Sequence, residues 1–463
     1  MTSKFDYDVV IAGASIAGST LALLLAKEGL SVALIDMKPR EKIGEKVCGD
    51  GISASYFDKL GIPKPSGPEL ASVIHASEVI APDREHILTV EGLGYTIDRW
   101  HLNQRLVNDA EKKGTHVLDS MLVIGPLVEG EEVRGVRVRD LKSGEEKEIR
   151  GKVTVDATGF AAVIRKRLPE GMLIENDIER FDVAAAYREI VMSDDDYPWP
   201  SDRIYIYLSH KFAPGGYTWI FPKGKNVANI GLGIQPLPDA PKAVALLEKF
   251  KRFWDIKVSK VLHAGGGVVP VRRALSQLVS NGLLLVGDAA SQANPLHGGG
   301  MGQAMIAAKI ASEVISSNVE GEKVLTKEEL WEYAVRYMRS DGAKNAALEI
   351  IRLLLQGMTD KEINFIIEKK IVSGEELLAI ESTSKESEVV WRKILRIILT
   401  RKIRLLGRLK KARDLYYLIR GHFQNYPENP QDLPAWHEKT TQIIMEARKK
   451  LWRSPLQHTF YKQ

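Results

Sequence analysis

Cysteine is almost absent from this sequence. Cys48 is the single cysteine among 463 residues, so the chain cannot form an internal disulfide, a cysteine-rich zinc site or an iron–sulfur cluster. We therefore expect an intracellular protein with no metal site. Any redox chemistry would have to come from a bound organic cofactor.

Long apolar runs are also missing. The apolar stretch 9–26 is interrupted by Gly13 and Gly18, and Asp6 and Asp8 precede it where a signal peptide needs basic residues. No other stretch approaches the roughly 18 apolar residues of a membrane span. A content of 44% hydrophobic and 27% charged residues is typical of a soluble globular protein with two or three domains.

The chain has no general excess of one charge, because its net charge is only +5. Segment 391–420 alone carries eleven basic residues and one acidic residue. Its pattern predicts a basic amphipathic helix, or two helices broken near Gly407, with Arg401, Lys402 and Arg408 on the basic face. Such a helix either packs its apolar stripe on the protein or binds an anionic membrane surface. We expect a cytoplasmic, peripherally membrane-associated protein, and no nucleic-acid partner, since no nucleic-acid fold accompanies the charge.

The N-terminal region has the pattern of a nucleotide-binding βαβ unit. The sequence predicts a buried strand over Tyr7–Ala12, an apolar helix over Ser19–Gly29 and a second strand over Ser31–Asp36. The glycine-rich turn Gly13–Gly18 joins the first strand to the helix, whose N-terminus can bind a pyrophosphate. A parallel-sheet turn without a ligand is the alternative for this turn alone.

Individual residues of this unit have expected roles. Gly13 makes the tight turn, and Gly18 allows close packing of the helix on the strand. Asp36 lies where a carboxylate can accept a ribose hydroxyl. Ser15 replaces the usual middle glycine, and its side chain narrows the approach to the phosphates while offering a hydroxyl to one of them.

Two further predicted strands end in runs of small residues. Val153–Gly159 (VTVDATG) and Leu283–Ala290 (LLLVGDAA) are both predicted as buried strands whose ends let a ligand approach the backbone closely. Gly298–Gly302 (GGGMG) then opens an apolar helix over Gln303–Ser317, which is a second glycine-rich helix start.

Taken together, these motifs resemble the flavoproteins of the p-hydroxybenzoate hydroxylase type. Two features resemble the geranylgeranyl reductases within that superfamily: Lys46–Gly51 (KVCGDG), and Pro214–Pro222 (PGGYTWIFP) followed by Gly231–Gly233 (GLG). The resemblance covers roughly residues 5–320. It implies one bound FAD, with Asp288 at the ribityl–pyrophosphate region.

The resemblance also implies which residues contact FAD. Arg99 matches the arginine of the family, with Arg105 as the alternative, and a surface ion pair would explain either arginine without a ligand. The expected cofactor-binding residues are Gly13, Ser15, Ile16, Ala17, Gly18, Asp36, Cys48, Gly49, Gly51, Arg99, Asp288, Gly300 and Met301.

The middle of the chain has the period-two pattern of strands at Ile204–Leu208 and at 217–221. Tyr217, Trp219 and Phe221 share one face of the second strand. They are either core aromatics of an antiparallel sheet or substrate-binding residues. In the family fold this sheet covers the flavin, and an aromatic face suits a long hydrocarbon chain.

Cys48 and Gly49 are the candidate catalytic residues. The resemblance places their segment over the isoalloxazine ring, where glycines permit close approach. Three roles are open for Cys48: a packing residue, a residue that shapes the site, or the proton donor. The last is possible because a neutral thiol can donate a proton without burying a charge.

The expected architecture is an α/β (α+β) protein with a Rossmann-like FAD-binding domain, an antiparallel-sheet substrate domain and a helical C-terminal region. Their expected ranges are 1–170 with 260–320 (and substrate-sheet insertions near 65–100), 171–259, and 321–463. Helices are predicted over Lys323–Gln356 and Lys361–Ile380. The glycine run Gly265–Gly267 lacks the helix that a second nucleotide site would need.

The function implied is an FAD-dependent reductase that saturates isolated C=C bonds of geranylgeranyl lipid chains in archaeal-type lipid synthesis. The electrons would come from an external donor, either NAD(P)H or a ferredoxin-like protein. An FAD-dependent aromatic monooxygenase and a non-catalytic prenyl-lipid escort protein are the alternatives.

Overall fold

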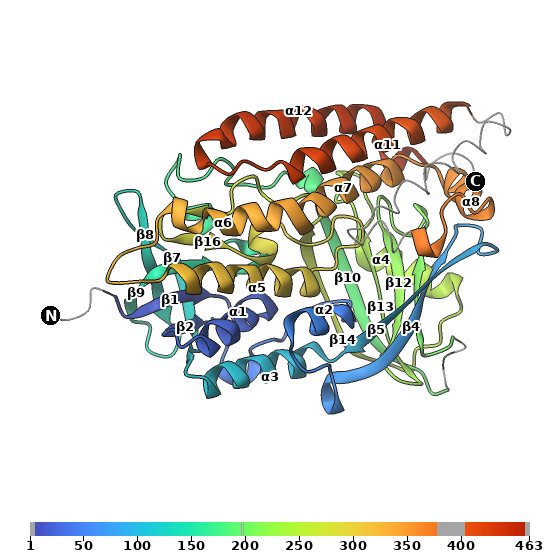
Figure 1. Cartoon of the computed structure of the whole chain (residues 1–463). Helices are drawn as coiled ribbons and strands as arrows, with labels where there is room; N and C mark the ends of the chain where they lie inside the picture. The colour runs from blue at the N-terminus through green and yellow to red at the C-terminus, as the bar shows by residue number, and fades with distance from the viewer. Residues whose placement is uncertain (1–4, 196, 198, 377–402, 459–463) are drawn as a thin grey trace.

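The structure is a computed structural model that describes residues 5–195, 197, 199–376 and 403–458. Its strands form two eight-stranded sheets, with the N-terminal βαβ unit in one and the aromatic strand 217–222 in the other. Helices α11 (Ile403–Gln424) and α12 (Leu433–Leu451) lie along α7 (Ala343–Gln356) on one side of the molecule (Figure 1).

The first sheet has the order β15-β16-β9-β1-β2-β6. These strands are β1 (Tyr7–Ala12), β2 (Val32–Ile35), β6 (His116–Leu118), β9 (Glu146–Asp156), β15 (Val279–Ser280) and β16 (Leu283–Leu285). Strand β1 pairs in parallel with β2 and β9, and its last four residues are fully buried, as in a central strand covered on both faces. The antiparallel strands β7 (Met121–Glu129) and β8 (Glu132–Asp140) extend the sheet from the first half of β9.

Helix α1 (Ile16–Lys27) follows β1 and packs against α3 (Arg99–Lys112) and α5 (Met301–Asn318). It starts three residues before the predicted Ser19, so the glycine-rich turn is shorter than its sequence suggests. Gly29, just beyond the helix, has a φ of +83°, the left-handed conformation expected of a glycine at a helix end.

The second sheet has the order β14-β10-β13-β12-β11-β4-β5-β3. Its strands are β3 (Gly51–Ser53), β4 (Leu70–Ile80), β5 (Ile87–Ile97), β10 (Val183–Met192), β11 (Arg203–Tyr207), β12 (Tyr217–Pro222), β13 (Val227–Ile234) and β14 (Lys260–Pro270). The expected range 260–320 places strand β14 in the FAD-binding domain, but this strand pairs with β10 at the edge of the second sheet. The run Gly265–Gly267 therefore lies within a strand. Helix α4 (Ala243–Phe253) packs on β10 and β13.

The remaining helices are α2 (Ser55–Leu60), for which the sequence analysis makes no prediction, α6 (Lys327–Tyr337) and α8 (Asp360–Glu368). Helices α6 and α8 are shorter than the predicted helices that overlap them. A π-helical turn, Met338–Gly342, joins α6 to α7, so the predicted helix Lys323–Gln356 is interrupted rather than regular. Helix α8 ends before Lys370, whose φ is +47°, so the predicted extension toward Ile380 is wrong at this point. Among the described residues, no helix has the length and apolarity needed to cross a membrane.

The predicted basic helix face is wrong at Arg408. This residue is 8% exposed, and its guanidinium donates to the carbonyl oxygen of Leu451 at 3.2 Å, so it ties α11 to the end of α12. Helix α11 also runs through Gly407 without a break. Arg404 and Lys410 of the predicted face are exposed on α11, whereas Arg401 and Lys402 fall outside the described residues.

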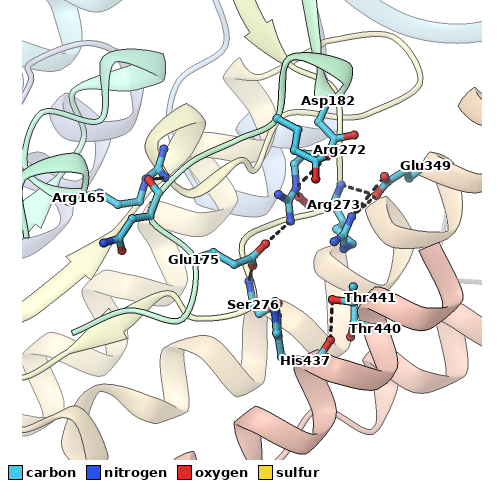
Figure 2. A network of polar contacts seen from close by, with 12 residues as sticks. Arg165, Glu175, Asp182, Arg272, Arg273, Ser276, Glu349, His437, Thr440 and Thr441 are labelled. Atoms are coloured by element: carbon cyan, nitrogen blue, oxygen red, sulfur yellow. Dashed lines mark hydrogen bonds and ion pairs between the residues drawn. The ribbon is translucent and has the colours of Figure 1, made fainter. Parts of the chain in front are cut away.

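A buried ionic network joins α7 and α12 to the segments that precede β10 and follow β14 in the second sheet (Figure 2). Asp182 accepts hydrogen bonds from Arg448 of α12 at 2.8 Å and from Arg352 of α7 at 3.4 Å. Glu349 of α7 accepts from the Arg273 side chain at 3.3 Å. Burial alone would raise the pKa of Asp182, but the surrounding guanidinium groups outweigh it and hold this pKa below its ordinary value.

Candidate functional site

The turn between β1 and α1 depends on two glycines. Gly13 has a φ of +100°, and a Cβ there would lie 2.4 Å from the carbonyl oxygen of Ala157 at the end of β9. A Cβ on Gly18 would lie 1.9 Å from the carbonyl oxygen of Gly13. The turn is therefore packed too tightly for any side chain at either position. It presents the first amide groups of α1, which begins at Ile16, as an anion site.

Arg99 and Ser15 meet at this turn. Nη2 of Arg99, the first residue of α3, donates to Ser15 Oγ at 2.9 Å, while its Nε is buried and has no hydrogen-bond partner among the described residues. Arg105, the alternative, is paired with Glu69 at 2.5 Å. A guanidinium with an unpaired buried donor beside a helix N-terminus suits a phosphate oxygen.

Asp36 braces the same turn from the end of β2. Its carboxylate accepts hydrogen bonds from the backbone N–H groups of Ala14 at 3.0 Å and Lys38 at 2.9 Å. Each carboxylate oxygen has a further lone pair, which can accept from a ribose hydroxyl. The ribose contact stays a prediction, while the bracing contact is one that sequence spacing did not indicate.

Asp288 and Gly300, both expected at the cofactor site, lie close together across a loop. Asp288 lies in a 3₁₀ turn after β16, and a Cβ on Gly300 would lie 3.2 Å from its Oδ1. Met301 follows as the first residue of α5. Nζ of Lys46 lies 3.2 Å from Asp288 Oδ2. Lys46 was not predicted as a site residue, because nothing local indicates a contact across 242 residues.

The two glycine-rich turns are adjacent. A Cβ on Gly287 would lie 3.2 Å from the Cβ of Ala17, which belongs to the first turn of α1. The turn that Arg99 and Ser15 approach and the turn that carries Asp288 therefore pack against each other at the ends of β1 and β16.

The three predicted aromatic residues lie in a row on β12. The ring centroids of Tyr217 and Trp219 are 5.8 Å apart, and those of Trp219 and Phe221 are 6.0 Å apart. Trp219 and Phe221 are buried, whereas Tyr217 is half-buried and donates its hydroxyl to the carbonyl oxygen of His297 at 2.6 Å. Burial raises the pKa of Tyr217, so the phenol stays protonated as this donor. The role of this row as a hydrocarbon wall stays a prediction.

The segment of Cys48 covers the end of this aromatic row. Cβ atoms on Gly49 and Gly51 would lie 3.2 Å and 3.4 Å from the Phe221 ring. The carbonyl oxygen of Cys48 accepts from Nδ2 of Asn229 at 2.8 Å and from Nε of Arg188 at 3.2 Å. Sequence reasoning missed both donors, which lie on β13 and β10.

The arrangement fits FAD. The α1 N-terminus with Arg99 and Ser15 provides donors for a pyrophosphate, and Arg99 Nε is an unpaired buried donor that such a group would satisfy. Asp288 and Gly300 lie close together beside this turn. The Cys48 segment meets the aromatic strand at Phe221, and its role beside a ring and a substrate chain stays a prediction.

Comparison with protein families and known sequences gives consistent matches. Residues 182–269 match the geranylgeranyl reductase catalytic domain. The chain is 35% identical to the digeranylgeranylglycerophospholipid reductase of Sulfolobus acidocaldarius, over 97% of this chain and 99% of the relative. It is 32% identical to digeranylgeranylglycerophospholipid reductase 2 of Methanothermobacter thermautotrophicus, over 82% and 94% of the two chains.

Solved structures share the fold. A geranylgeranyl bacteriochlorophyll reductase-like protein from Thermoplasma acidophilum has a TM-score of 0.75 at 22% identity, over 88% of this chain and 99% of that chain. The flavin-dependent brominase Bmp2 has a TM-score of 0.59 at 19% identity, over 95% and 99%. The predicted fold class, a Rossmann-like flavoprotein with a second sheet and C-terminal helices, is confirmed.

Proposed function

The chain belongs to the geranylgeranyl reductase family of FAD flavoproteins, and from this premise we propose that it saturates isolated C=C bonds of geranylgeranyl chains in archaeal-type membrane lipid synthesis. The observation that carries the proposal is the contact between the Cys48 segment and the aromatic row of β12, beside the FAD surface. This contact joins the two motifs that distinguish the reductases from other flavoproteins of the same fold.

When bound, FAD would supply a hydride for one carbon of the double bond. The chain's own residues would bind and orient this cofactor: Arg99 with Ser15 and the α1 amides would hold the pyrophosphate, and Asp36 would hold a ribose. Asp288 would contact the ribityl–pyrophosphate region. Lys46, paired with Asp288, neutralises its charge at the site.

Protonation has to lead or accompany hydride delivery, because an isolated alkene is a poor hydride acceptor. The second carbon therefore needs a proton from an acid beside a dry pocket. We assign this position to the segment of Cys48 and Gly49, which packs against the ring of Phe221. A thiol is a weak acid for an alkene, so we assign Cys48 to shaping the site and modulating reduction.

The aromatic row favours a hydrocarbon over a polar substrate. Tyr217, Trp219 and Phe221 form a row of rings that ends against the Cys48 segment, and the Tyr217 hydroxyl already donates to the carbonyl oxygen of His297. A monooxygenase that binds phenols would need polar groups to position its substrate, and this face of β12 offers rings instead. An escort protein would not need the FAD surface around Asp288.

An external donor supplies the electrons, and the enzyme works at an anionic membrane surface where its lipid substrate resides. Exposed basic residues on α11, such as Arg404 and Lys410, support the surface contact. Anaerobic mixing of the protein with NADPH, NADH or a reduced ferredoxin would identify the donor from the bleaching of the flavin absorbance.

Product analysis tests the function. The protein, a reductant and a digeranylgeranylglycerophospholipid should give lipids heavier by two hydrogens for each reduced double bond. Cys48→Ser should retain FAD and change the rate or the extent of reduction, and Cys48→Ala should do the same. Lipid of unchanged mass with a flavin-loaded wild type would overturn the proposed function. Wild-type rate and product distribution in both variants would leave Cys48 a packing residue.

A further inference from the structure

We propose that Asn229 is a positioning residue that holds the Cys48 segment against the second sheet, and that Trp219 orients its side-chain amide. The consequence for catalysis rests on the proposed reductase function, whereas the positioning itself does not. Trp219 lies on β12 and Asn229 on β13, and these two strands are neighbours in the sheet.

Both ends of the Asn229 side chain have hydrogen-bond partners. Its side chain is fully buried, and its Nδ2 donates to the carbonyl oxygens of Cys48 at 2.8 Å and Gly49 at 3.1 Å. Its Oδ1 accepts from Nε1 of Trp219 at 3.0 Å. Because an indole can only donate, it selects the amide oxygen and leaves the amide nitrogen for the two carbonyls.

Two charged side chains hold the same segment from other directions. Arg188 of β10, which is 6% exposed, donates to the Cys48 carbonyl at 3.2 Å. Lys223, directly after β12, is paired with Asp50 at 2.9 Å. Burial lowers the pKa of Arg188, while the nearby Asp50 and Cys48 favour its charged form. Asn229 is the neutral member of this set and the member that contacts two consecutive carbonyls.

The tryptophan of the β12 motif thus has a polar role besides its apolar one. Without the amide of Asn229, the part-buried carbonyl oxygen of Gly49 would lose this donor, and leaving such an acceptor unpaired is costly. The segment would relieve this cost by moving toward water, and the Cys48 thiol would move with it. Its position over the FAD surface would then be lost.

The single cysteine provides a reporter that needs no lipid substrate. The rate of alkylation of Cys48 by iodoacetamide should rise about tenfold or more in Asn229→Leu, which has a similar volume and no donors. Trp219→Phe should raise the rate several-fold, because the amide loses its orienting donor. Both rates are measured on FAD-loaded and cofactor-free protein. In turnover, kcat should fall more than KM for the lipid rises.

Thr218→Val is the matched control. Thr218 is fully buried on the other face of β12, and its hydroxyl donates to the Tyr207 carbonyl at 3.4 Å. This variant also loses one buried hydrogen bond in the same strand, but the alkylation rate should stay within about twofold of wild type.

Three results would overturn the proposal: wild-type alkylation rates in a folded Asn229→Leu, wild-type rates in Trp219→Phe, or an equal rise in Thr218→Val. If Asn229→Leu does not fold, Trp219→Phe decides the question. A wild type that reduces no lipid would remove the proposed function while the thiol measurement still tests the positioning.

Discussion

Replacing Arg99 by Ala should weaken FAD binding about 10- to 150-fold. The Arg99 guanidinium donates from Nη2 to Ser15 at 2.9 Å and has a buried Nε without a partner among the described residues. A phosphate oxygen that accepts from Nε would complete the bonding of this guanidinium. A hydrogen bond to a charged group contributes about 1.5–3 kcal/mol, and about 1.4 kcal/mol is a tenfold change in Kd. Titration of cofactor-free protein with FAD, followed by flavin fluorescence, gives this constant directly.

Arg105→Ala is the control for this measurement. Arg105 lies on the same helix but is paired with Glu69 at 2.5 Å, away from the turn. Its loss should change the Kd for FAD by no more than about twofold, since the ion pair is not part of the cofactor surface. A wild-type Kd in a folded Arg99→Ala, or an equal loss in both variants, would refute the assignment of Arg99 to the pyrophosphate.

Three further perturbations test other parts of the account. Asp182→Asn should lower the free energy of unfolding at pH 7 by about 3–5 kcal/mol. Because the pKa of Asp182 is lowered in the folded state, its contribution to stability is complete above about pH 4 and is lost as the pH falls below that value. In urea unfolding, the free energies of unfolding of the wild type and the variant should therefore converge as the pH is lowered. A difference between them that stays constant with pH would contradict this prediction. Tyr217→Ala should raise KM roughly tenfold for geranylgeranyl lipids and less for geranyl analogues in steady-state assays, whereas equal effects on both would indicate a packing role. Charge reversal at Arg404 and Lys410 should weaken sedimentation with anionic vesicles, as should added salt, and salt-independent binding would argue against an electrostatic contact.

The sequence predicted those parts of the fold that depend on local patterns. β1 begins and ends as its apolar run indicates, and the alternation of β12 gives its bounds to within one residue. The tight turn at Gly13 and the close packing at Gly18 were predictable because a glycine permits both, and the structure shows backbone atoms where the Cβ atoms of larger residues would lie.

Contacts between distant segments were not predictable in the same way. Asn229 carries no local sign that its amide would bind the carbonyl of Cys48, since a polar residue in a strand can equally face solvent. Lys46 reaches Asp288 only because β16 and the segment after β2 meet in space. Arg408 belongs to a segment with the composition of a basic helix face, but the packing of α11 on α7 and α12 places its side chain inside the protein. In each case the tertiary arrangement decides which partner a polar side chain finds.

Anaerobic oxidation of the reduced protein by a prenyl lipid tests the central claim most directly. The flavin is reduced chemically, the excess reductant is removed, and a digeranylgeranylglycerophospholipid is added without oxygen. The account predicts that the absorbance of oxidised flavin returns in step with lipid that has gained two hydrogens, and that phenols cause no such return. A flavin that stays reduced with the lipid present, or that is reoxidised with no change in lipid mass, would contradict it.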